Sequence, residues 1–139
     1  MAGTYEFDSK DSQLVYGGKL VGGYMAGTYI SVVRNNDMWT TTVGADSYGT
    51  RVKSNNFSGR ITITLQQTSP SNDDLNAIAT SDELNNDGAL PLFFRHGNFV
   101  ATAVTAWIVK RPDSDFSNDL SPRVWVLETE NLTISNAAA

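Results

Sequence analysis

The stretch RITITLQQTSPSNDDLNAIATSDEL, residues 60–84, changes its hydrophobic period halfway along. Its first half alternates aliphatic side chains with neutral polar ones: Ile61, Ile63 and Leu65 against Thr62, Thr64 and Gln66. A period of two places the aliphatic residues on one face of a β-strand and the hydroxyl and amide groups on the other. The first half therefore predicts a strand that buries one face only.

The second half predicts a helix over about residues 72–85. Ser69-Pro70-Ser71 interrupts the strand, and Ser71 is the expected N-cap, with Asp74 complementing the free amides of the first turn. Gly88 stands where a C-cap glycine is expected. The apolar residues between these ends recur at helical spacing: Leu75, Ile78 and Ala79. We expect this short helix to lie over an end or edge of a sheet.

Turn residues divide the remaining chain into strands. Gly17-Gly18 predicts a tight hairpin between residues 13–16 and 19–21. Residues 28–34 and 38–43 are predicted to form a second hairpin through Asn35-Asn36-Asp37. Further strands are expected around Tyr5 and Phe7 and over 50–54, 90–95, 99–110 and 123–134. Eight or nine strands with one helix predict a mainly β protein, an antiparallel β-sandwich or split barrel with one flanking helix, as a single domain over residues 1–139.

Composition excludes several kinds of function. The chain has no cysteine and one histidine, so thiolate metal sites are excluded and histidine-based catalysis has little material. A net charge of −5 argues against a phosphate-binding surface over the whole molecule. We expect no signal peptide and no membrane anchor, because residues 1–4 carry no basic region and no apolar run approaches about 20 residues.

Three patterns resemble catalytic or metal sites, and each has a simpler interpretation. His96 falls in a predicted turn without catalytic partners. The acidic run from Asp113 to Asp119 lacks the glycine and the final acid of a calcium loop, where Asn118 and Val124 stand instead. Glu128 and Glu130 share one face of the last predicted strand, whereas glycosidase acids normally sit on different elements. We therefore predict no catalytic, metal or cofactor-binding residues, no cofactor and no enzyme.

Several predicted strands have β-branched residues on one side and Thr, Ser or Gln on the other. Such sheets can line a surface without binding tightly to a molecule that moves along it. Their exposed edges need closing, and pairing with an identical neighbour is one way to close them. This pattern favours assembly over catalysis.

Several stretches of this sequence are typical of one known family: Val43-Gly44-Ala45-Asp46, Arg51–Asn55, and most specifically the block from Thr64 to Asn72. The pattern extends over most of the chain, from the Gly-Gly hairpin to Ala106-Trp107-Ile108. In these residues the sequence resembles a family of small virion structural proteins from contractile-tailed bacteriophages.

This resemblance implies a tail tube protein, whose six-membered rings stack into a hollow tube inside a contractile sheath. Each subunit would contribute strands to a continuous β-barrel around a lumen that conducts DNA. The implied partners are copies of the chain, the tail sheath protein, and a tape measure protein or DNA held in the lumen without sequence specificity. The implied location is the virion tail, assembled in the host cytoplasm. Six copies at −5 each would carry about −30, which would keep DNA phosphates from adhering.

Two sets of residues are candidates for these roles. The candidate lumen wall, on the 28–43 hairpin and the 61–67 strand, comprises Thr28, Ile30, Val32, Thr40, Thr42, Thr62, Thr64 and Gln66. The candidate contacts between subunits or rings, from residues 43–50 and 17–27, comprise Gly44, Asp46, Tyr48, Arg51, Gly18 and Tyr24. The family implies no catalytic residues to carry over.

Three alternatives stay open. Within the same class, the chain could be the inner tube of a contractile bacteriocin or secretion device. A carbohydrate-binding β-sandwich would use exposed tryptophans among Trp39, Trp107 and Trp125 as a stacking platform. A two-acid hydrolase acting through Glu128 and Glu130 ranks third.

Overall fold

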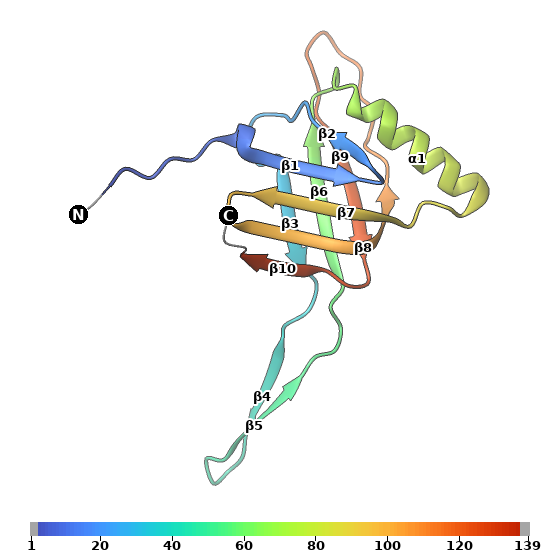
Figure 1. Ribbon diagram of the computed structural model, residues 1–139. Helices are drawn as coiled ribbons and strands as arrows, with labels where there is room; N and C mark the ends of the chain where they lie inside the picture. The colour runs from blue at the N-terminus through green and yellow to red at the C-terminus, as the bar shows by residue number, and fades with distance from the viewer. Residues whose placement is uncertain (1–2, 137–139) are drawn as a thin grey trace.

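The computed structural model describes residues 3–136 and shows two β-sheet layers that cross at a steep angle, with one helix at one end (Figure 1). The ten strands of this part of the chain are β1 (Ser12–Tyr16), β2 (Lys19–Val21), β3 (Ile30–Arg34), β4 (Trp39–Val43), β5 (Gly49–Lys53), β6 (Gly59–Leu65), β7 (Leu90–His96), β8 (Phe99–Lys110), β9 (Arg123–Thr129) and β10 (Thr133–Asn136). A short 3₁₀ turn, η1, covers Ser9–Asp11, and the helix α1 covers Ser71–Asn85. The predicted antiparallel sandwich with one flanking helix is confirmed.

The long strand β8 belongs to both layers. Its first half pairs with β7 and β10, which completes a first layer in the order β2-β1-β7-β8-β10. From Ala106 onward β8 pairs with β9, which starts a second layer in the order β8-β9-β6-β3. The register shifts between Ile108 and Lys110, as expected where a strand bends from one sheet into the next.

Strand β6 confirms the period of two in the opening stretch. Ile61, Ile63 and Leu65 are fully buried between the layers, while Thr62 and Thr64 lie on the opposite, partly exposed face. Trp125 and Leu127 on β9 stand beside the buried β6 residues and are also fully buried. The core lies between the two layers and under α1, whose Leu75 and Ala79 close it.

The predicted hairpin over residues 28–43 is wrong. Strand β3 pairs with β6, Ile30 opposite Ile63 and Val32 opposite Ile61, while β4 pairs only with β5. The apolar face of β3 is covered by the aliphatic face of β6, and the threonine-rich strand β4 has no such face to offer. Residues 39–53 therefore form a separate two-stranded hairpin that projects from the body (Figure 1).

Both predicted helix caps are wrong, although the helix is where it was expected. Ser71 is the first helical residue, and its Oγ accepts a hydrogen bond from the Gly22 amide at 2.9 Å, so it is not free to cap; Pro70 occupies the N-cap position. At the other end Asn86, not Gly88, adopts the left-handed conformation, with φ 57°. Asparagine tolerates this conformation better than most residues, so the helix ends before it reaches the glycine.

Two strand predictions also need correction. Residues Tyr5 and Phe7 lie in an extended arm without strand pairing. The strand predicted over 123–134 is two strands, because the chain turns after Thr129. The Thr129 hydroxyl accepts a hydrogen bond from the Asn131 amide at 3.2 Å and donates one to the Thr105 carbonyl at 2.6 Å.

No helix in residues 3–136 has the length and apolar character needed to cross a membrane.

Tyr16 joins the segment between α1 and β7 to strand β8 through its hydroxyl. This buried hydroxyl donates to the Gly88 carbonyl at 2.8 Å and to the Ala106 carbonyl at 2.9 Å. Burial, with a smaller contribution from the Asp82 carboxylate, raises the pKa of Tyr16 well above its usual value. The neutral hydroxyl is therefore the form that the fold requires.

Replacing Tyr16 with Phe is expected to lower the free energy of unfolding by about 1–3 kcal/mol, because two buried carbonyls lose their donor. Since the pKa of Tyr16 is raised on folding, its contribution is complete below the unfolded pKa of about 10 and is lost as the pH rises above that value. Urea unfolding at pH 7 and above pH 10 checks both points. The wild type should lose more stability on alkaline titration than Tyr16→Phe, and equal losses would contradict this assignment.

Candidate assembly surfaces

The outward face of the second layer, which we call the wall face, carries few charged side chains. It is built from residues of β3, β6, β9 and the end of β8 that stand in register: Ser31, Val33, Arg60, Thr62, Thr64, Val124, Val126, Glu128, Trp107 and Lys110. Arg60 Nη2 lies 2.7 Å from Glu128 Oε1, and Lys110 Nζ, at the end of β8, lies 3.9 Å from Asp113 Oδ1. The wall face therefore presents mainly hydroxyls and β-branched side chains, and its charged groups have partners of opposite charge.

Glu128 and Glu130 do not form a carboxylate pair. Glu128 is held by Arg60, and Glu130, in the bend after β9, accepts a hydrogen bond from the Thr105 hydroxyl at 3.3 Å. In a hydrolase one acid would need to be protonated and the other charged across a cleft. The two carboxylates have separate partners, and no cleft in the described residues brings them together.

The candidate lumen-wall residues do not share one face. Thr62 and Thr64 lie on the wall face, but Ile30 and Val32 stand opposite Ile63 and Ile61 and pack against the core. Thr40 and Thr42 lie together on one face of the β4–β5 hairpin. Thr28 and Gln66 lie just outside the paired strands β3 and β6.

The hairpin arm, residues 39–53, is the largest uncovered feature of the subunit. All ten residues of β4 and β5 are exposed. Its exposed large apolar side chains, with that of the adjoining Met38, are Met38, Trp39, Val43, Tyr48 and Val52. The Arg51 guanidinium lies 4.1 Å from the centre of the Trp39 ring, which stiffens one face of the arm. So much apolar surface on a projecting arm indicates a contact surface for another molecule.

The candidate contact residues fall into three places. Gly44, Asp46, Tyr48 and Arg51 are brought together on the hairpin arm, with Tyr48 78% exposed at its tip. Gly18 lies in the β1–β2 turn, where its φ of 80° suits a tight hairpin. Tyr24 lies away from both, in the loop between β2 and β3.

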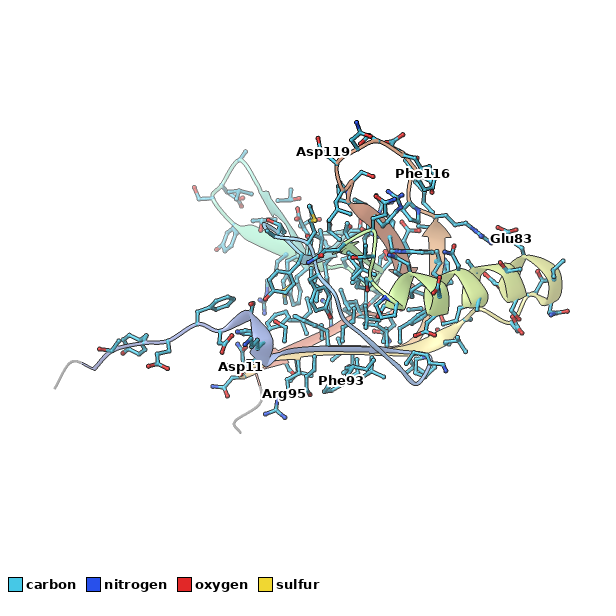
Figure 2. The ribbon with its side chains drawn as sticks, turned by 90° about the horizontal axis from the view of Figure 1, so that it is seen from above. Asp11, Glu83, Phe93, Arg95, Phe116 and Asp119 are labelled. Carbon is cyan, nitrogen blue, oxygen red and sulfur yellow. The ribbon has the colours of Figure 1, made fainter. Side chains whose placement is uncertain are left out.

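A second projecting element, the N-terminal arm of residues 3–8, was missed as a candidate surface. It runs away from the body, as Figures 1 and 2 show, and Tyr5 is 98% exposed. Phe7 stacks on His96 with ring centroids 4.6 Å apart, and His96 Nδ1 lies 2.7 Å from Ser12 Oγ. The alternation of Tyr5 and Phe7 with polar residues predicted a strand. The sequence pattern alone does not show whether such a strand has a partner to pair with.

The first layer also has an uncovered outer face. Figure 2 shows Phe93 and Arg95 pointing away from the core on this side. Val15, Phe93 and Thr102 stand in register across β1, β7 and β8 on this face. Within residues 3–136, β2 and β10 end the first layer, and β3 and the last part of β8 end the second, each without a partner strand on one side. Each leaves a row of backbone groups available to a further strand.

The tryptophans do not form a sugar-stacking platform. Trp125 is fully buried, with its Nε1 donating to Asn72 Oδ1 at 2.9 Å, while Trp39 is on the hairpin arm and Trp107 is on the wall face. Residues 3–136 contain no cluster of three or more His, Asp or Glu side chains placed to hold a metal ion. The described surface is therefore organised as arms, edges and flat faces.

Comparison with solved structures shows that this fold occurs in proteins of contractile injection systems. The fold matches the sheath/tube terminator of an extracellular contractile injection system (PVC), with a TM-score of 0.70 and 14% identity over 96% of this chain and 99% of that one. It also matches a chain of the PVC sheath–tube complex, with a TM-score of 0.66 and 13% identity over 96% and 93% of the two chains. At these identities the matches show the fold alone.

Sequence comparison is more specific. Residues 4–135 match the family model of the bacteriophage PhiTE tail tube protein. A structural protein, ORF10 of Pseudomonas phage KPP10, is 33% identical over 118 residues, which cover 82% of this chain and 68% of that protein. The chain belongs to the PhiTE family of bacteriophage tail tube proteins, and the resemblance found in its sequence is confirmed.

Proposed function

We propose that copies of this chain form six-membered rings, that the rings stack into the inner tail tube of a phage, and that the tube conducts DNA into the host. The subunit has no enzymatic role in this proposal. It would occupy the virion tail after assembly in the host cytoplasm.

The hairpin arm is the observation that carries this proposal. The residues that flank it are joined where the Ser54 amide donates to the Met38 carbonyl at 2.9 Å, and all ten residues of its strands are exposed. An isolated subunit gains nothing from an exposed arm with four large apolar side chains, whereas a neighbour in the same or the next ring can cover it. Gly44, Asp46, Tyr48 and Arg51 would make these contacts.

The wall face is the proposed lining of the lumen. Its surface is mainly hydroxyl and β-branched side chains, and its cations, Arg60 and Lys110, lie beside the carboxylates of Glu128 and Asp113, so it offers DNA phosphates few binding groups. Thr40 and Thr42 would extend this lining along the hairpin arm, while Ile30 and Val32 support it from the core. The free edge of β3 would pair with a neighbouring subunit and continue the sheet around the ring.

The proposed tube would also have partners other than copies of this chain. The matched PVC structure is a complex of sheath and tube, and we propose that a tail sheath protein surrounds this tube in the same way. A tape measure protein or DNA would fill the lumen without sequence-specific contacts. An inner tube of a bacteriocin or secretion device stays the second candidate, because the matched fold also occurs in an injection system.

Negative-stain microscopy of the purified protein, with sedimentation velocity over a range of concentrations, tests the proposal. We expect rings or rods with a central channel, and little double-stranded DNA sedimenting with them at physiological salt. A chain that stays monomeric at every concentration would overturn the tube assignment. Genes for a capsid and a packaging motor beside this one would favour the phage over the bacteriocin.

A further inference from the structure

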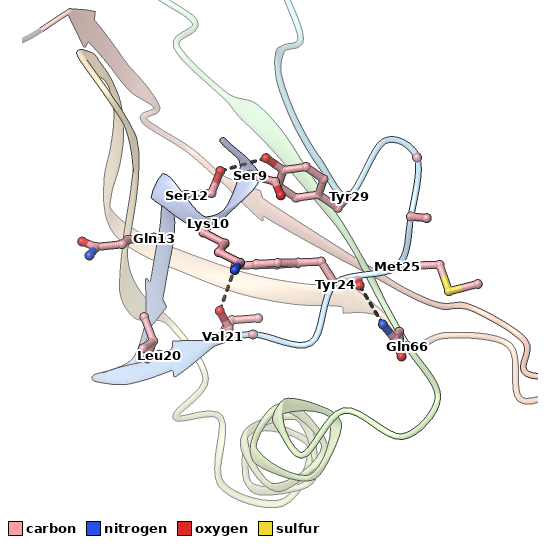
Figure 3. A pocket seen from close by; sticks show the side chains of 13 residues that line it. Ser9, Lys10, Ser12, Gln13, Leu20, Val21, Tyr24, Met25, Tyr29 and Gln66 are labelled. Atoms are coloured by element: carbon pink, nitrogen blue, oxygen red, sulfur yellow. Dashed lines mark hydrogen bonds between the residues drawn. The ribbon is translucent and has the colours of Figure 1, made fainter. Parts of the chain in front are cut away.

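A groove of about 730 Å³ opens beside the base of the N-terminal arm, between η1, β2 and the loop that leads to β3 (Figure 3). The rings of Tyr24 and Tyr29 lie together there, with centroids 5.1 Å apart. Leu20 and Met25 add apolar surface to the lining. The groove is therefore a largely aromatic and aliphatic site on an otherwise polar part of the surface.

The two tyrosines are held in place by their own subunit. The Tyr24 hydroxyl donates to the Val21 carbonyl at 2.8 Å, and the Tyr29 hydroxyl lies 2.9 Å from Ser12 Oγ. Burial, with a smaller effect from Tyr29, raises the pKa of Tyr24 to about 12, so this donor stays protonated. Because the hydroxyls are satisfied, what the groove still offers a ligand is the surface of the rings, which suits an aromatic side chain.

The N-terminal arm leaves the subunit in a fixed direction. Asp8 Oδ1 accepts from the Lys10 amide at 2.9 Å and caps η1, and the stack of Phe7 on His96 holds the next part of the arm against β7. Beyond Phe7 the chain runs away from the body, which leaves Tyr5 almost fully exposed. An arm anchored in this way cannot turn back into the groove at its own base.

The charges of arm and groove are complementary. The arm carries two acids, Glu6 and Asp8, and no base between residues 3 and 8. Among the described residues that line the groove, the charged one is Lys10. An extended segment that places Tyr5 on the rings brings Glu6 to the same rim of the groove, within reach of a lysine.

We infer that the tyrosine groove of one subunit binds the N-terminal arm of a second copy, with Tyr5 stacked on Tyr24 and Tyr29 and Glu6 near Lys10. The contact is head-to-tail, because each subunit gives an arm at one place and offers a groove at another. Repeated contacts of this kind close into a ring when the rotation between copies closes. The inference rests on the proposed self-assembly and names one surface that holds neighbouring copies together.

Cysteine cross-linking tests this contact cleanly, because the natural chain has no cysteine. Thr4→Cys chains, which keep Tyr5, are mixed with Met25→Cys chains, assembled, and treated with a short bismaleimide. The matched control replaces Met25→Cys with Val104→Cys, at a position that is 85% exposed on β8. We expect cross-linked dimers with the groove variant to exceed those with the control several-fold, and neither variant alone to give them.

Sedimentation of the same samples separates the possible failures. If rings or tubes form and the groove pair links no better than the control, the arm contact is wrong while the proposed function stands. If a doubly substituted Thr4→Cys/Met25→Cys chain links within itself as a monomer, the arm occupies its own groove and the inference is overturned. If no assembly forms with the wild-type chain, the proposed function fails and this contact fails with it.

Discussion

A subunit that lacks the hairpin arm is expected to fold normally and to form no tubes. The deletion replaces residues 39–53 with Asn-Gly between Met38 and Ser54, whose backbones are already joined by a hydrogen bond of 2.9 Å. All ten strand residues removed are exposed and none belongs to the core. The melting temperature should therefore change by only a few degrees, whereas assembly should fall below detection.

Circular dichroism melting and negative-stain microscopy measure the two effects in the same preparation. A second variant keeps the arm and removes three of its four large apolar side chains, as Trp39→Ser, Val43→Ser and Tyr48→Ser. This variant should show weakened assembly with an unchanged melt, because the arm is present but has less surface to bury. Tubes of normal length from the deleted chain would show that the arm is not the contact between copies.

The parts of the fold that were predicted correctly have patterns that specify their own environment. Ile61, Ile63 and Leu65 require a buried face whatever strand lies beside them, and the spacing of Leu75 and Ala79 requires a helix with one buried side. Gly17-Gly18 determines a tight hairpin locally, through its two positive φ values. In each case residues close together in the sequence are sufficient to determine the local structure.

The errors arise where the partner of an element decides its structure. The turn residues after β3 suggested pairing with β4, but Ile30 and Val32 need an aliphatic partner, and β6 supplies it 30 residues later. By residue type Ser71 is an acceptable N-cap, but in the fold its hydroxyl accepts a hydrogen bond from the Gly22 amide instead. Pairing of this kind depends on contacts distant in sequence, which a periodicity cannot reveal.

The same distinction applies to the surfaces. Thr62 and Thr64 were expected on a polar face and lie on one, because alternation alone determines it. Their grouping with Ile30 failed, because the register between strands was unknown. The tyrosine groove combines η1, β2 and the β2–β3 loop with Gln66 from the end of β6, and no local pattern in these segments predicts that they meet.

The sparsely charged wall face gives the other large expected effect, which concerns DNA. The substitutions Thr62→Lys and Thr64→Lys add two cations per subunit to the wall face, or twelve to each ring of the proposed tube. Glu128 is already paired with Arg60 and leaves the new lysines without a strong partner. If the wall face lines the lumen, DNA inside the tube meets closely spaced ammonium groups and is retained, because each neutralised phosphate releases counterions.

The measurement is co-sedimentation of short double-stranded DNA with assembled tubes between about 50 and 200 mM salt, a range over which several phosphate contacts change affinity by orders of magnitude. Wild-type tubes should retain little DNA, and tubes of the lysine variant should retain it strongly at low salt and lose it steeply as salt rises. The matched control, Asn76→Lys with Ala77→Lys, adds the same charge at exposed positions of α1. Equal retention by both variants would place the wall face away from the lumen, since only charge that lines the channel can act on DNA inside it.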